Sequence, residues 1–165
     1  MNSEGATSDT SEGLKGRLRA DLTDAIRSQD EVTVATLRLA LAAITKAEVA
    51  GDTSVTLTDE QIVELLRGEG KRRAEAAELY ERGDRAELAG RERAQAAVLE
   101  RYLPAEIDDA ALRAIVAEEV ATAQAEGATG GKAMGQVIKA VRARVGADAS
   151  GGRVAAAVKA ALGTG

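Results

Sequence analysis

Hydrophobic residues recur at helical spacing along nearly the whole chain, and hardly any segment alternates hydrophobic and polar residues. A repeat of about 3.6 residues is typical of amphipathic helices, whereas strict alternation would indicate strands. The pattern predicts seven helices and no sheet. The predicted fold class is therefore all-α.

Four of the predicted helices precede Pro104, the single proline of the chain. Proline cannot donate a backbone hydrogen bond and disfavours helical geometry in the residue before it, so a helix should end here. Four amphipathic helices of this length can enclose a small core of their own. They are expected over residues 14–28, 31–50, 59–82 and 85–103.

Two of these helices begin with a capping pattern. Thr58 stands three residues before Gln61, which is the spacing of a capping box, where each side chain bonds the backbone N–H of the other residue. Asp84 stands three residues before Glu87 in the same way. We therefore expect Thr58 and Asp84 to cap the third and fourth helices.

Three shorter helices are predicted after Pro104, separated by the glycine-rich segment 127–131 and by Gly146. Asp108 or Asp109 would cap the first of them and Ser150 the last, since Asp and Ser are preferred N-cap residues. The predicted domains are a disordered leader over residues 1–13, a four-helix domain over 14–103 and a small three-helix domain over 104–165, joined by a hinge at Pro104.

The composition removes most catalytic chemistry. The chain has no His and no Cys, which excludes imidazole bases, thiol nucleophiles, Cys/His zinc sites and disulfides. It also lacks Phe and Trp, so aromatic platforms for stacking bases are excluded. The glycine-rich segment joins two helices and follows no strand, unlike a phosphate-binding loop. We predict no catalytic residue, no cofactor and no metal site.

Charge is unevenly distributed along the chain, whose net charge is −5. From Gly127 to Gly165 there are six basic residues and one acidic residue, so this third carries +5 and the rest −10. On the sixth helix, basic residues lie opposite the hydrophobic face. Such a surface could contact RNA phosphates, although an ordinary basic surface would give the same pattern. The candidate RNA-binding residues are Lys132, Lys139, Arg142, Arg153 and Lys159.

Basic residues of the first four helices are given structural roles. The run Lys71-Arg72-Arg73 is interpreted as a solvated helical face in preference to an anion site. Arg38, in the second helix, is interpreted as joining helices through a carboxylate in preference to binding a ligand.

No stretch approaches the ~18 consecutive apolar residues of a membrane span, so no membrane partner is expected. The first residues have neither the basic nor the apolar region of a secretory signal. The expected location is the cytoplasm.

Several short motifs occur in a fixed order from Leu14 to Leu162. Together they resemble the YqeY-like (GatB/YqeY) family. The motifs are Leu37-Arg38-Leu39, Ala42-Ala43-Ile44, Lys71-x-Arg73, Tyr80, Gly83, Arg85, Leu88, Glu92, Tyr102-Leu103-Pro104, Met134-Gly135-Gln136-Val137-Ile138-Lys139 and Arg153-Val154.

The C-terminal half is similar to the tail domain of the B subunit of glutamyl/aspartyl-tRNA amidotransferase, the helical part that contacts the tRNA. The resemblance implies a tie to carbon–nitrogen ligation with glutamine as the amide donor. It names tRNA and an amidotransferase-like complex as candidate partners. Because the chain has no room for the catalytic cradle domain and shows no glutaminase triad, we expect a non-catalytic module.

Two other functions stay open from the sequence. A protein–protein adaptor would use the alanine-rich helix faces to receive a partner helix. A freestanding amidotransferase would need a glutaminase centre, for which the residues offer no support. The hypothesis of an RNA-binding module depends on basic residues of the C-terminal third remaining free of carboxylate partners.

Overall fold

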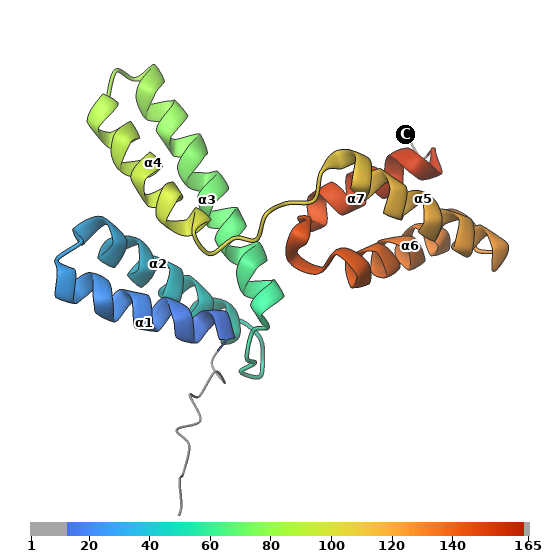
Figure 1. Ribbon diagram of the computed structural model, residues 1–165, viewed down its shortest axis with the longest axis horizontal. Coiled ribbons are helices and arrows are strands. Elements are labelled where there is room, and N and C mark those ends of the chain that lie inside the picture. Colours follow the sequence, from blue (N-terminus) through green and yellow to red (C-terminus); the bar gives the residue numbers. More distant parts are fainter. Residues whose placement is uncertain (1–12, 164–165) are drawn as a thin grey trace, which may run out of the picture. The chain divides into compact units, whose positions relative to one another are not determined.

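The computed structural model describes residues 13–163, which form seven α-helices, one short 3-10 helix and no strand in that range (Figure 1). The all-α prediction is confirmed. The predicted leader lies outside the described residues except for Gly13, which begins the first helix. The helices are α1 (Gly13–Ser28), α2 (Glu31–Glu48), α3 (Asp59–Arg82), α4 (Ala86–Glu100), α5 (Asp109–Ala125), α6 (Gly130–Val145), the 3-10 helix Gly146–Asp148 and α7 (Gly151–Leu162).

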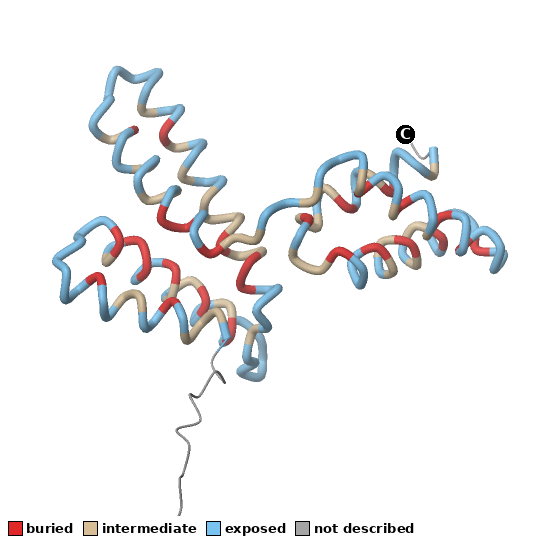
Figure 2. The backbone as a smooth tube through the Cα atoms, in the orientation of Figure 1, coloured by how far each residue is buried: buried red, intermediate tan, exposed pale blue. Residues whose placement is uncertain are grey.

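The chain divides into two compact units between Leu103 and Pro104. The first unit contains α1 to α4 and the second contains α5 to α7. Buried residues form a separate cluster in each (Figure 2). Independent folding of the two units and a hinge at Pro104 stay predictions.

The first unit consists of two helical hairpins, α1 with α2 and α3 with α4, which share one core (Figure 1). Ile26, in the last turn of α1, is 49% exposed. The last turn of α1 lies beyond the core, and Ala25 is its buried residue. The core contains Leu18, Leu37, Ala40, Ile44, Ile62, Leu66, Val98, Leu99 and Tyr102.

The far ends of α3 and α4 extend beyond this core as a two-helix arm. Its buried residues are the small Ala77 and Ala89, which allow the two helices to approach closely. Arg73 of α3 bonds Glu92 of α4 at 3.2 Å and is only 15% exposed, so it does not lie on a solvated face. With a single partner helix, α3 leaves Leu79 64% exposed.

The structure shows three of the four predicted caps. Gln61 N–H donates to Thr58 Oγ1 at 3.3 Å, and Thr58 N–H donates to Gln61 Oε1 at 2.9 Å, which completes the capping box. Asp108 accepts from the Ala111 N–H at 2.8 Å. Ser150 accepts from the Arg153 N–H at 3.2 Å.

The predicted cap at Asp84 is wrong, because this residue ends α3 instead of beginning α4. Its φ is 55°, in the left-handed region, and the next residue, Arg85, donates to the Tyr80 carbonyl at 2.8 Å. This is the geometry of a helix C-terminus that closes with a left-handed residue. Arg85 is the residue before α4, and its side chain makes no capping hydrogen bond.

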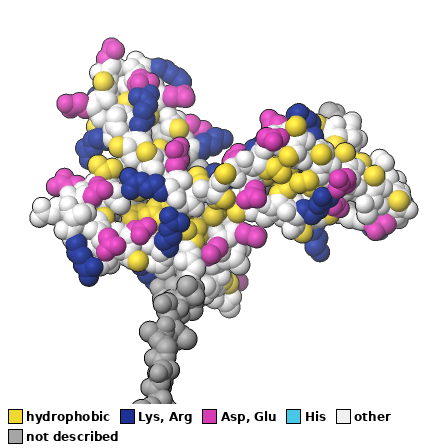
Figure 3. Space-filling model, viewed as in Figure 1, with side chains coloured by type: hydrophobic (Ala, Val, Ile, Leu, Met, Phe, Trp, Pro, Cys, Tyr) yellow, Lys and Arg dark blue, Asp and Glu magenta, His cyan; other side chains and the backbone are white. Residues whose placement is uncertain are grey.

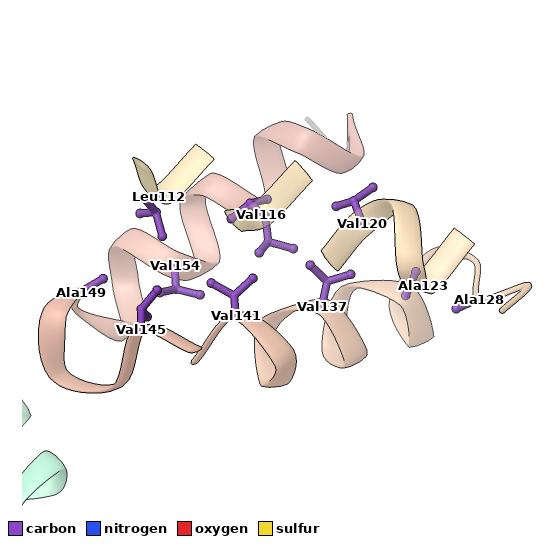
Figure 4. Close-up of a cluster of buried hydrophobic side chains, with 12 residues drawn as sticks. Leu112, Val116, Val120, Ala123, Ala128, Val137, Val141, Val145, Ala149 and Val154 are labelled. Carbon is purple, nitrogen blue, oxygen red and sulfur yellow. The ribbon is translucent and has the colours of Figure 1, made fainter. Parts of the chain in front are cut away.

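The second unit is a three-helix bundle with a core of mostly valine and alanine. Figure 4 shows Val137 and Val141 pointing from α6 into the space between α5 and α7. The Ile107 N–H donates to the Asp148 carbonyl at 2.7 Å, which ties the segment before α5 to the turn before α7. The core contains Leu112, Val116, Val120, Ala123, Ala128, Ala133, Val137, Val141, Val145, Ala149, Val154 and Val158.

One carboxylate is buried in the first unit. Glu48 accepts from Lys15 Nζ at 2.5 Å and from the Leu57 N–H at 3.3 Å, so it ties α1 and the loop before α3 to the end of α2. The hydrogen bond from Lys15 lowers the pKa of Glu48 below its usual value of 4.5, against the opposing effect of burial. The ionised form is therefore the one that the fold stabilises.

Glu48→Gln should cost stability at neutral pH and progressively less in acid. A depressed folded-state pKa contributes stability above the unfolded-state pKa, and that contribution is lost as the pH falls through the folded-state value. Urea unfolding at about pH 7 and at about pH 3.5 measures the difference between variant and wild type. The exposed Glu87→Gln is the control. A difference that stays constant or grows in acid contradicts this role of Glu48.

Candidate nucleic-acid interface

Helix α6 has one fully basic face. Lys132, Lys139 and Arg142 are exposed and lie within about 80° of arc, opposite the buried valines. They span about 15 Å of the helix axis. The helix contains no Asp or Glu, and none of the three side chains has an ion-pair partner within residues 13–163. We call these three residues the α6 basic face.

Arg144, also on α6, has a different role. Its Nη1 donates to Glu118 Oε2 at 2.6 Å and to Glu119 Oε1 at 3.0 Å, both on α5. These hydrogen bonds, above all the one that Glu118 accepts, raise the pKa of Arg144 further above its already high value. Its charge is therefore used to hold α6 against α5.

Arg153 is likewise engaged within the second unit. Its guanidinium donates to Glu106 Oε2 at 2.7 Å, to Asp109 Oδ1 at 2.6 Å and to the Ile107 carbonyl at 2.9 Å. The contact with Asp109 is the main cause that raises the pKa of Arg153. Arg153 thus joins α7 to the start of α5. Lys159 is exposed on α7 and also has an intramolecular interaction.

The charge of the second unit is balanced as a whole. Residues 104–165 contain seven basic and seven acidic side chains, so the unit is neutral and the first 103 residues carry the net −5. The fold brings acidic residues of the α5 region, outside the basic third, into the same bundle. On the face shown in Figure 3, basic and acidic side chains are interspersed. Among the described residues of the second unit, the basic side chains without an ion-pair partner are Arg113 on α5 and, on α6, Lys132, Lys139 and Arg142.

An apolar groove lies between α5 and α7. It has a volume of about 570 Å³ and is lined by Leu112, Val116 and the alanines of α7, with Arg113 and Arg153 at its rim. Arg113 is exposed and was not singled out from the sequence, which holds no signal that distinguishes it from other surface arginines. It lies at this groove, on the α7 side of α5, and does not extend the α6 basic face.

A polar cluster in the first unit surrounds Tyr102. The phenol donates to Asp21 Oδ2 at 2.7 Å, and the Arg17 guanidinium lies 4.9 Å from the ring centroid. Burial, followed by the bond to Asp21, raises the pKa of Tyr102, so the phenol stays protonated. The cluster lines a pocket of about 330 Å³ and fixes the end of α4 to α1. Tyr102, Asp21 and Arg17 interact with one another, so we interpret the cluster as structural and not as a binding site.

Within residues 13–163, no three carboxylates are grouped as ligands of a metal ion would be. In the same range, no helix combines the length and hydrophobicity that a membrane crossing requires.

The comparison with known proteins identifies the family. No curated protein matches the chain. The family model described as Yqey-like protein matches residues 15–162, which is nearly the whole sequence and includes both units. The resemblance inferred from the motifs is therefore confirmed at the level of the family, and the similarity of the C-terminal half to an amidotransferase tail stays a prediction. The chain belongs to the YqeY-like family.

Proposed function

We propose that this protein is a non-catalytic helical module that binds RNA, with tRNA as the first candidate, through the α6 basic face. One observation carries the proposal: three cations lie together on α6 without a carboxylate partner among residues 13–163, while Arg144 and Arg153 are engaged inside the bundle. The resemblance to an amidotransferase tail supports the choice of tRNA.

The α6 basic face suits the sugar–phosphate backbone of an RNA. Lysine and arginine side chains bind phosphates without reading the bases, so contacts of this kind position the RNA and do not select a sequence. Gly135 lies on the same face, and a Cβ at this position would meet no atom within 4 Å. The missing side chain lets a phosphate approach the helix between Lys132 and Lys139.

The proposal limits the role of this chain in amide transfer. The family resemblance ties it to carbon–nitrogen ligation with glutamine as the donor, and the chain would contribute by holding the tRNA or by joining an amidotransferase-like complex. Two of the candidate RNA-binding residues, Arg153 and Lys159, would contribute less to RNA binding, because both already have an interaction within the protein.

The salt dependence of tRNA binding tests this mode directly. Three phosphate contacts should give a slope of about −2 to −3 when the logarithm of the association constant is plotted against the logarithm of salt concentration. Filter binding of bulk tRNA between low and moderate salt measures it. A slope near zero, or no binding at low salt, would contradict the proposal.

A protein–protein adaptor is the second candidate function. It is favoured by exposed hydrophobic residues on α2, in the first unit. This surface shares no residue with the α6 basic face.

A further inference from the structure

The outward face of α2 carries hydrophobic residues that the other helices of the first unit leave largely exposed. Val32 is 41% exposed and Leu39 is 53% exposed, and Ala35 and Ala42 are exposed between and after them. Their spacing alternates between three and four residues. This is the repeat by which one helix packs its side chains into another. We call Val32, Ala35, Leu39 and Ala42 the α2 seam.

The α2 seam is additional to the face that α2 uses in its own fold. Leu37, Ala40 and Ile44, on the other side of the helix, are buried in the core of the first unit. A helix that is hydrophobic on both sides is normally buried on both. From Val32 to Lys46 the outward face extends for about 21 Å, which is enough for four turns of a partner helix.

Two cations border the seam. Arg38 and Lys46 are exposed, and neither forms an ion pair with any described residue, so the interpretation of Arg38 as a link between helices is wrong. The carboxylate on this outward face is Glu31, at the beginning of α2. The border of the seam is therefore positively charged beside its middle and at its C-terminal end.

The surface is also hollowed at one end. An open hollow of about 640 Å³ lies beside the turn between α1 and α2 and is lined by Ile26, Gln29, Glu31, Val34, Ala35 and Arg38. A cavity of this size admits a large apolar side chain from a partner. In Figure 3, hydrophobic surface lies beside Lys and Arg side chains on the visible face of the first unit.

We propose that the α2 seam is a docking surface for an amphipathic α-helix of a partner protein that carries acidic side chains beside its apolar stripe. The apolar stripe would pack along the α2 seam, with one large side chain in the cavity near Ile26. Glu or Asp residues at its edges would pair with Arg38 and Lys46. Helix-in-groove binding of this type uses anchors at spacings of three and four residues.

Charge argues against a second copy of this chain as the occupant. Two paired copies of α2 would bring together four unpaired cations, from Arg38 and Lys46, and only two copies of Glu31. Like charges placed across an interface disfavour that pairing. An acidic helix removes the conflict, because each cation then gains a carboxylate.

The test uses a fluorescent synthetic helical peptide of about 21 residues, with Leu and Ala at seam-like positions and Glu at the flanks. A matched peptide has Lys in place of each Glu. Fluorescence anisotropy with the full chain should show binding of the Glu peptide and no binding of the Lys peptide. Leu39→Asp should weaken binding at least about tenfold, whereas Leu79→Asp, at a still more exposed leucine on α3, should not change it.

Reversing the charges gives the sharpest outcome. In the double variant Arg38→Glu, Lys46→Glu the preference should invert, so that the Lys peptide binds and the Glu peptide does not. Equal binding of both peptides by the wild type, or no binding of either, would overturn the proposal. So would sedimentation that shows a dimer of the chain dissociating in Leu39→Asp. Because the α6 basic face is untouched in these variants, tRNA binding reports separately on the proposed function.

Discussion

Leu37→Ala should lower the free energy of unfolding of the first unit by about 3–5 kcal/mol. Leu37 is fully buried among Leu18, Ile44 and Leu66, so the substitution leaves a cavity where the hairpins meet. Such a loss is a large part of the stability of a small domain. Hydrogen exchange of the full chain, followed peptide by peptide, measures it within each unit. Amides of α1 to α4 should exchange faster, and those of α5 to α7 should be unaffected.

The neighbouring leucine provides the control. Leu39 is two residues further along α2 but points outward, so Leu39→Ala should change stability by no more than about 0.5 kcal/mol. If Leu37→Ala loosens α5 to α7 to the same extent as α1 to α4, the two units unfold as one. That result would remove the predicted independence of the domains.

The triple variant Lys132→Glu, Lys139→Glu, Arg142→Glu should weaken tRNA binding by about 100-fold or more at low salt. It replaces three attractive phosphate contacts by three repulsive charges on the same helix face. The salt dependence should disappear with the affinity, since few counterions remain to be released. Filter binding over a range of salt concentrations measures both effects. The three residues are exposed and form no ion pair with another described residue, so the bundle should remain folded.

A matched triple variant separates a local site from net charge. Arg38→Glu, Lys46→Glu and Arg85→Glu change the net charge by the same amount, but all three lie in the first unit. This variant should lose only the modest part of the affinity that depends on overall charge. An equal loss in both variants would show that binding follows net charge. Unchanged affinity in the α6 variant would refute the proposed function.

The local features of the fold were predictable from the sequence because their causes lie within a few residues. The capping box at Thr58 and the cap at Ser150 need only a side chain and a backbone N–H three positions away. The error at Asp84 also comes from relying on a local pattern. An Asp three residues before a Glu suits a helix start, but the turn between two closely packed helices placed it at the end of α3.

The candidate site was predictable only in part, because the charge partners are distant in the sequence. The carboxylates that bond Arg153 lie 44 and 47 positions away, and those that bond Arg144 lie 25 and 26 positions away. Helical periodicity places Lys132, Lys139 and Arg142 on one face, but it does not show which cations the tertiary fold neutralises. The α2 seam was hidden for a similar reason, since its hydrophobic residues look like core residues until the core is known.

The two-helix arm has a practical consequence for work on this protein. Its tip, at Gly83 and Asp84, is exposed and lies far along both helices from the core of the first unit, and the residues between helices there are few. Exposed loop tips of this kind tolerate insertions best. The tip is therefore the natural place to lengthen the chain with an epitope or a reporter domain, which would leave both cores, the α2 seam and the α6 basic face intact.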